Sequence, residues 1–216
     1  MNILKSFSLM SFFTFFSRVL GYLRDLIFAF TLGATSNADS FLLAFRLPNL
    51  FRRLFAEGAI NNALIPIYLN IKKKEGNKKA SLFSSHIFSF LLITLIIVTV
   101  ICEIFMKDII KILAPGFTEE LILRTSFLAS IMFPYLILIS LSSYFAALLN
   151  AKGKFALWAF TPLILNALMI VAMALSFYKN LITELALSWS VIFSGILQIL
   201  IMFFWSYRNK IKFKLV

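Results

Sequence analysis

Residues 38–59 of the chain read ADSFLLAFRLPNLFRRLFAEGA. Three arginines, one aspartate and one glutamate are embedded here among leucine, phenylalanine and alanine side chains. Residues 17–25, SRVLGYLRD, combine arginine and aspartate with an apolar run in the same way. An arginine at the centre of a membrane helix costs about 2.5–3.5 kcal/mol even on lenient insertion scales. The meaning of these charges therefore depends on whether the two stretches lie in a membrane.

The composition of the whole chain places them there. The chain has 216 residues, of which 61% are hydrophobic and 14% are charged, whereas a soluble domain has about 25% charged residues. Its mean hydropathy is +0.94. The roughly 132 apolar side chains suffice for about six helices of ~20 residues that cross a bilayer. A soluble enzyme, a disordered chain and a secreted disulfide scaffold are excluded, and the sequence predicts an all-α polytopic membrane protein.

Six apolar runs separated by polar clusters mark the predicted spans of a single transmembrane lobe, residues 1–216. They cover residues about 8–31, 40–69, 82–106, 121–149, 156–177 and 183–206. The second and fourth are longer than a perpendicular helix requires, so we expect tilt or a kink. The run KKKEGNKK at 72–79 connects the second and third spans. Pro115-Gly116 is expected to end any short interfacial helix in the connection 107–120.

The N-terminal residues imitate a signal peptide, because Lys5 is followed by an apolar stretch that reaches Phe16. A cleavable signal would end in a small-x-small site. Here Ser17 and Arg18 follow and the apolar pattern resumes. We therefore expect no cleaved signal.

The chain offers little for metal, redox or catalytic chemistry. Cys102 is the only cysteine and His86 the only histidine, which excludes an internal disulfide and a cysteine or histidine metal cluster. No nucleophile–base pair and no glycine-rich phosphate loop is present in the sequence. We expect no enzymatic activity, no metal and no cofactor.

The distribution of cations predicts the orientation. With a cytoplasmic N-terminus, twelve cations lie on the cytoplasmic side: Lys5, Lys72, Lys73, Lys74, Lys78, Lys79, Lys152, Lys154, Arg208, Lys210, Lys212 and Lys214. The opposite side has only Lys107, Lys111, Arg124 and Lys179, together with several acids. The positive-inside rule therefore predicts that both termini are cytoplasmic. We interpret the lysines as topology signals that also attract anionic lipid headgroups, so the net charge of +12 does not indicate a nucleic-acid partner.

The five remaining cations are all arginines and all lie in the first two spans: Arg18, Arg24, Arg46, Arg52 and Arg53. Three acids, Asp25, Asp39 and Glu57, accompany them. Arginine stays charged when desolvated and presents a planar fork that matches carboxylate or phosphate oxygens. The choice of arginine in the spans and lysine in the loops therefore favours a water-filled cavity that holds an anionic, phosphate-bearing ligand.

Helical spacing groups some of these charges. Positions seven apart lie within about 20° of each other on a helix, so Arg18 and Asp25 share a face, as do Asp39, Arg46 and Arg53. Pro48 is expected to kink the second span and to free carbonyl groups near Ala44. The glycines, Pro134, Pro162, Asn150 and Asn166 are interpreted as turn, bend, cap or packing residues and not as ligands.

A purely structural interpretation of the cluster stays open. The pairs Arg18–Asp25 and Arg53–Glu57 could neutralise each other, Asp39 could lie at the interface, and Arg46 could snorkel to a headgroup. Five arginines against three acids still leave a surplus of +2 in this hairpin.

The quoted motifs at 17–25 and 38–59 resemble the start of the MurJ (MviN) family of lipid II flippases. LAPGF at 113–117, FPYLILISL at 133–141 and LNAKGKF at 149–155 are similar to that family as well. The resemblance spans essentially the whole chain. It implies one six-helix lobe of the two-lobed multidrug/oligosaccharidyl-lipid/polysaccharide exporter fold, in the bacterial inner membrane, that translocates lipid II for cell-wall synthesis.

The resemblance also implies roles for individual residues. Arg18, Arg24 and Arg52 match the cavity arginines thought to hold the pyrophosphate of lipid II. Asp25, Asp39, Arg53 and Glu57 would be their charge partners or gating residues. Coupling to sodium or to the membrane potential is implied through a site in the second lobe.

The chain departs from the family pattern because it stops after six of about fourteen expected spans. We therefore expect it to pair with a separate second-half polypeptide, to self-associate, or to be a non-transporting remnant or assembly subunit. A related exporter of another lipid-linked saccharide or of a drug is the alternative within the transporter class.

Overall fold

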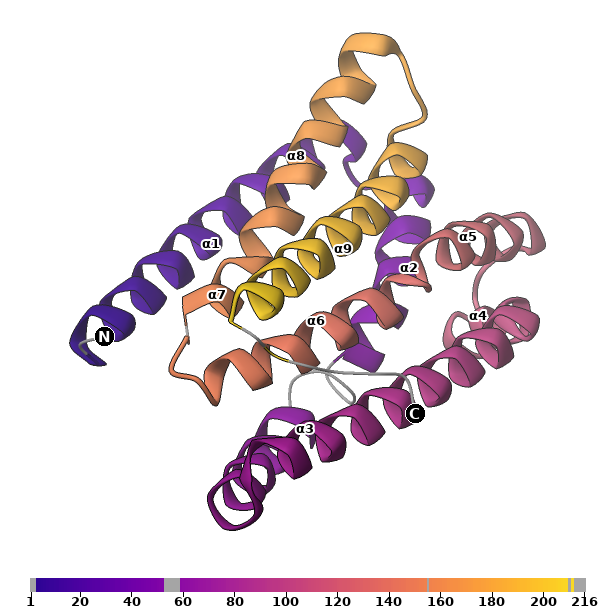
Figure 1. Cartoon of the computed structure of the whole chain (residues 1–216). Coiled ribbons are helices and arrows are strands. Elements are labelled where there is room, and N and C mark those ends of the chain that lie inside the picture. The colour runs from indigo at the N-terminus through magenta and orange to yellow at the C-terminus, as the bar shows by residue number, and fades with distance from the viewer. Residues whose placement is uncertain (1–2, 53–58, 155, 210, 212–216) are drawn as a thin grey trace.

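The computed structural model describes residues 3–52, 59–154, 156–209 and 211, and all regular structure among them is helical. The helices are α1 (Ile3–Leu32), α2 (Ser36–Arg52), α3 (Ala59–Ile104), α4 (Met106–Leu113), α5 (Glu119–Met132), α6 (Tyr135–Asn150), α7 (Ala156–Ala159), α8 (Thr161–Lys179) and α9 (Thr183–Arg208). Figure 1 shows them as one bundle, with α1 beside α8 and with α9 between α8 and α6.

The described helices confirm the all-α membrane class. Four helical stretches have the length and apolar composition of membrane spans: 64–104, 119–150, 157–179 and 183–208. The arginine-bearing α1 and α2 are not among the four, so the number of six spans stays a prediction. Large apolar side chains such as Phe30 and Phe90, 85% and 71% exposed, point away from the bundle as lipid-facing residues do.

Proline produces the bend that the length of the fourth predicted span requires. The helix α5 ends at Met132 and α6 begins at Tyr135, with Pro134 between them. Proline has no N–H and its ring clashes with the preceding turn of a helix. The next two amides donate hydrogen bonds to carbonyls three residues back instead of four. The Leu136 amide donates to the Phe133 carbonyl at 2.9 Å, and the Ile137 amide donates to the Pro134 carbonyl at 3.1 Å. The predicted kink is confirmed here.

The basic run at 72–79 is helical on both sides of a single break at Gly76. This residue has φ 87° and ψ 176°, a backbone conformation that favours glycine because it has no Cβ. Lys79 and Glu75 form an ion pair of 2.8 Å that bridges this break. The predicted connection is therefore a one-residue break between two helical segments of α3, and not an extended loop.

The short helix α4 is followed directly by the segment at Pro115-Gly116, as predicted. Beyond it, Thr118 caps α5 by accepting a hydrogen bond from the Leu121 amide at 3.4 Å. Lys107 and Lys111 of α4 both contact the Glu119 carboxylate, at 3.3 and 3.0 Å. These contacts fold the connection back onto the start of α5.

Helix α6 lies at the centre of the bundle, and residues 141–149 are buried without a gap. Its Tyr144 hydroxyl donates a 2.7 Å hydrogen bond to the backbone carbonyl of Ser84 on α3. On the other side α6 packs closely against α9. Because a buried hydroxyl needs a partner, this bond fixes the register between α3 and α6.

Replacing Gly195 of α9 by alanine is expected to destabilise the protein by about 1–3 kcal/mol, because overpacking forces neighbours apart. A Cβ at this position would lie 2.7 Å from Tyr135 Cδ2 and 2.9 Å from Leu138 Cδ1 on α6. Tyr135 is only 2% exposed and has no room to move. Thermal unfolding in detergent measures the change.

Gly116→Ala is the matched control, since a Cβ there would meet nothing within 4 Å. An unchanged unfolding midpoint for Gly195→Ala would contradict the prediction, because it would show that α6 and α9 can move apart without loss of stability.

Candidate functional site

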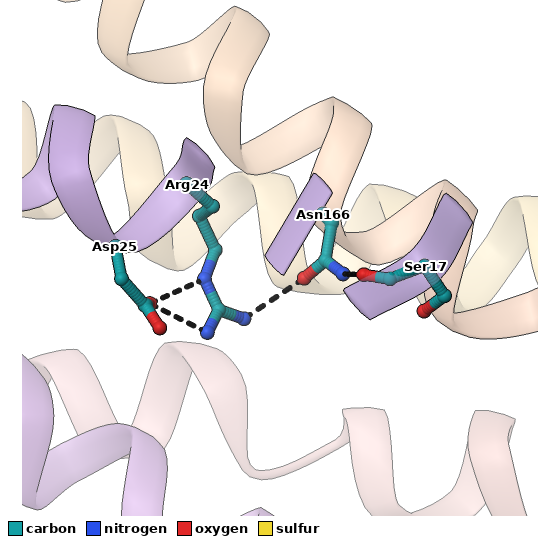
Figure 2. A network of polar contacts seen from close by, with 4 residues as sticks. All are labelled: Ser17, Arg24, Asp25 and Asn166. Carbon is teal, nitrogen blue, oxygen red and sulfur yellow. Dashed lines mark hydrogen bonds and ion pairs between the residues drawn. The ribbon is translucent and has the colours of Figure 1, made fainter. Parts of the chain in front are cut away.

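The polar centre of the bundle is built around Arg24, on the face of α1 that meets α8 (Figure 2). The Arg24 guanidinium donates through Nε and Nη2 to Asp25 Oδ1, at 3.0 and 2.7 Å. Its Nη1 donates to Asn166 Oδ1 on α8 at 2.9 Å. These bonds use three of the five N–H donors of a guanidinium. The two others make no hydrogen bond within the described part of the chain.

Asn166 ties the two helices together. Its Nδ2 donates to the backbone carbonyl of Ser17 on α1 at 3.1 Å, while its Oδ1 accepts from Arg24. Gly21 lies at the point of closest approach, where a Cβ would be 3.4 Å from Asn166 Nδ2. The side chain of Asn166 is buried, and its amide fixes the direction in which Arg24 points.

Arg24 lines a cavity of about 430 Å³, a volume in the range of small-ligand sites. Six helices contribute to its wall: α1, α2, α6, α7, α8 and α9. The remaining lining residues are Phe45, Asn49, Tyr135, Ile139, Trp158, Thr161, Pro162, Leu165, Asn166 and Gln198. Among the described lining residues Arg24 is the only charged one, so its guanidinium, paired with Asp25, lies between mostly apolar and amide side chains.

Hydrogen bonds hold the polar part of this wall in place. Gln198 Nε2 donates to the Thr161 carbonyl at 3.0 Å, and the Tyr135 hydroxyl donates to Gln198 Oε1 at 3.3 Å. Asn49 Nδ2 donates to the Phe45 carbonyl at 3.0 Å, one turn back on α2. The wall is therefore preorganised, and Arg24 is the group available to an anion.

The other predicted site residues are distributed around the bundle. Asp25 pairs with its neighbour Arg24 and not with Arg18, which is exposed on α1 and is not among the described residues that line the cavity. Asp39 and Arg46 line a second hollow of about 500 Å³ beside the segment that follows α4. Arg52 is the last residue of α2 and its side chain lies outside the description. Arg53 and Glu57 lie outside the described residues altogether.

The structure thus brings Arg24 and Asp25 together and places Asp39 near Arg46. Reasoning from sequence missed Asn166, which it interpreted as a bend or cap residue, and it did not single out Gln198 or Tyr135. An asparagine in the middle of an apolar span is the signal that could have found Asn166, because an amide in a membrane helix needs a partner.

A second polar pair was not expected from the sequence. Arg124, counted above among the cations opposite the cytoplasmic side, lies in α5 and forms an ion pair with Glu184 of α9. Glu184 is 3% exposed. The pair thus connects α5 and α9 through two residues that are 60 positions apart in sequence.

Comparison with known proteins gives a consistent picture. The family model "Lipid II flippase MurJ" matches residues 28–216. A "Probable lipid II flippase MurJ" of Buchnera aphidicola subsp. Baizongia pistaciae is 42% identical over 208 residues, which cover 94% of this chain and 40% of that protein.

The chain belongs to the MurJ family.

Other MurJ proteins agree with this assignment. That of Rickettsia prowazekii, also named as probable, is 40% identical over 94% of this chain, and the lipid II flippase MurJ of Burkholderia cenocepacia is 32% identical over 93%. A solved structure, "Lipid II flippase MurJ, inward closed conformation", superposes with a TM-score of 0.78 at 27% identity over 96% of this chain. The apolar helices and the MurJ family together make this a membrane protein of the bacterial inner membrane.

The chain spans about two fifths of the length of these MurJ relatives, 40% of the first two and 43% of the solved structure. The resemblance seen in the motifs at 17–25 and 38–59 is confirmed at the level of the family.

Proposed function

We propose that this chain is the lipid II-binding N-terminal lobe of a MurJ flippase and that the Arg24 cavity receives the pyrophosphate of the lipid-linked precursor. The observation that supports this most directly is the guanidinium of Arg24, aimed into a cavity by Asp25 and Asn166. Arginine matches a pyrophosphate because two of its parallel N–H groups can bond two phosphate oxygens.

Asp25 gives the site a resting partner. Its carboxylate neutralises Arg24 while its own side chain is 67% exposed, so it can turn away when a more highly charged anion arrives. When pyrophosphate binds, the Arg24 guanidinium donates to phosphate oxygens in place of the Asp25 carboxylate. When pyrophosphate leaves, the ion pair between Arg24 and Asp25 forms again. No covalent bond forms or breaks in this cycle. Asn166 keeps the guanidinium in the cavity in both states.

The remaining predicted residues have supporting roles in this proposal. Arg18 and Arg52, the other two arginines predicted to bind pyrophosphate, add positive charge along the path by which the headgroup reaches the cavity. Asp39, Arg53 and Glu57 act as charge partners or gating residues. The hollow lined by Asp39 and Arg46 supports a gating role for Asp39, because residues of the connecting segment after α4 line it as well.

Translocation needs two lobes in this proposal. Alternating access is largely the rocking of one half of a transporter against the other around a central site. The lobe described here therefore works against a second half. Coupling to sodium or to the membrane potential belongs to that second half, and both termini of this lobe face the cytoplasm.

Native mass spectrometry of the detergent-purified chain with lipid II tests the proposal. We expect a selective lipid II adduct that exceeds the adduct with undecaprenyl monophosphate at equal concentration, because the monophosphate offers fewer oxygens to the arginines. The same spectra report whether the chain is a monomer. Equal adducts for the two lipids would contradict pyrophosphate recognition, and a stronger adduct with another lipid-linked saccharide would favour the alternative exporter.

A further inference from the structure

A second cavity, separate from the Arg24 site, is lined by residues of the α6–α7 connection, of the C-terminal end of α9 and of α3 on both sides of its break. Its volume is about 560 Å³. Lys72, Lys78 and Lys152 line it, together with Asn77, Ser81 and Asn209. We name it the lysine pocket. Among the described residues, none lines both this pocket and the Arg24 cavity.

The charge of the lysine pocket is unbalanced. Three ammonium groups line it, and none of its described lining residues is acidic. The nearest acid in sequence, Glu75, forms its ion pair with Lys79, which is not a lining residue. The lining of described residues therefore has a surplus of three positive charges, which favours the binding of an anion.

Lys152 is the most constrained of the three. Its Nζ donates a hydrogen bond to the backbone carbonyl of Asn209, which fixes the ammonium group between the α6–α7 connection and the end of α9. Burial, and then repulsion from Lys72, lower the pKa of Lys152. A bound anion would reverse the second effect, because it would screen the two ammonium groups from each other.

The break at Gly76 shapes the pocket. Lys72 precedes it and Asn77, Lys78 and Ser81 follow it, so the two helical segments of α3 contribute to one wall. A helix that continued through residue 76 would carry Lys72 and Lys78 along one straight axis. The turn instead groups ammonium, amide and hydroxyl side chains around a common hollow, a combination that suits phosphate oxygens.

We propose that the lysine pocket binds a phosphate-bearing anion through Lys72, Lys78 and Lys152, either the headgroup of an anionic lipid or a soluble phosphate. The alternative is diffuse attraction by a lysine-rich surface, which falls off within a Debye length of about 8 Å at physiological salt and does not depend on which lysines are present. The chain contains the control that separates the two. Lys73 and Lys74 are exposed neighbours of Lys72 that do not line the pocket.

The experiment compares two double variants that each remove two charges, Lys72→Gln/Lys152→Gln in the pocket and Lys73→Gln/Lys74→Gln beside it. One arm titrates inorganic pyrophosphate into the detergent-purified chain by calorimetry at about 0.15 M salt. The other counts phosphatidylglycerol retained in native mass spectra after release from phosphatidylcholine bilayers that contain it. Both arms are repeated in an Arg24→Gln background, so that an anion held at the Arg24 cavity is not counted.

We expect the pocket variant to lose about tenfold in binding, whereas the neighbouring variant keeps the wild-type value. A loss confined to the lipid arm identifies the anion as a headgroup, and a loss in the calorimetric arm shows that soluble phosphate also binds. Equal weakening of the two variants, or no binding of either probe to the wild type, would overturn the proposal. The exposed Lys78→Gln leaves the Lys152–Asn209 bond untouched, so it gives the same comparison if the double variant folds poorly.

Discussion

Replacing Arg24 by alanine is expected to weaken lipid II binding by about a hundredfold, the loss of roughly two charge-assisted hydrogen bonds at a partly buried site. Arg24 is the only charged residue of the described cavity wall, and its side chain is 22% exposed. Without it Asp25 loses its ion-pair partner and leaves a negative charge beside the cavity. Native mass spectrometry with titrated lipid II measures the change.

Two further variants make this test specific. Arg24→Lys keeps the charge but loses the planar fork, so we expect an intermediate affinity. Arg46→Ala removes an exposed arginine that lines the other hollow, and lipid II binding at the Arg24 cavity should then stay near the wild-type value. If Arg46→Ala weakened binding as much as Arg24→Ala, the cavity would not be the recognition site.

Replacing Arg124 by alanine is expected to destabilise the protein by about 2–3 kcal/mol and to lower its unfolding midpoint in detergent by roughly 5–10 °C. The variant leaves the carboxylate of Glu184 buried at 3% exposure without its partner. The estimate lies below the usual cost of breaking a fully buried pair, because the Arg124 side chain is 38% exposed and solvent screens part of the interaction.

A double variant separates the pair from general damage to α5. Arg124→Ala/Glu184→Gln removes the buried charge as well as its partner, so we expect most of the lost stability to return. Lys111→Ala is the exposed control, since its contact with Glu119 is open to solvent and should not move the midpoint measurably. A double variant as unstable as Arg124→Ala alone would show that the ion pair is not the cause.

Much of the fold was predictable because it depends on local physics. Bilayer thickness sets the length of an apolar helix, so hydropathy alone predicts the long helices between residues 64 and 208. Proline has no N–H and its ring clashes with the preceding turn, so the bend at Pro134 and the end of α4 before Pro115 were predictable as well. The rule does not hold everywhere, because Pro48 and Pro66 lie inside α2 and α3 without ending them. The basic run at 72–79 was predicted less well, because lysine and glutamate form helices readily and only Gly76 interrupts them.

The candidate site was predictable in part. Composition and the difference between arginine and lysine singled out the hairpin that contains Arg24 and Asp25. Helical spacing alone suggested Arg18 as the partner of Asp25, whereas the structure pairs Asp25 with Arg24. Adjacent residues point about 100° apart on a helix, but a long arginine side chain can still reach its neighbour. Asn166 and Gln198 belong to helices far away in sequence, and periodicity within one helix gives no information on such contacts.

The sequence by itself determined that this is an all-α membrane protein of the MurJ family, and it determined which charges must be kept from lipid. Those properties follow from transfer free energies and from motif identity, which belong to each segment separately. Only the tertiary structure decided that Arg24 enters the cavity while Arg18 does not, that Asn166 orients it, and that Lys72 and Lys152 meet at one pocket. These choices depend on how α1, α3, α8 and α9 pack, since a long side chain takes its direction from the neighbours that the packing brings to it.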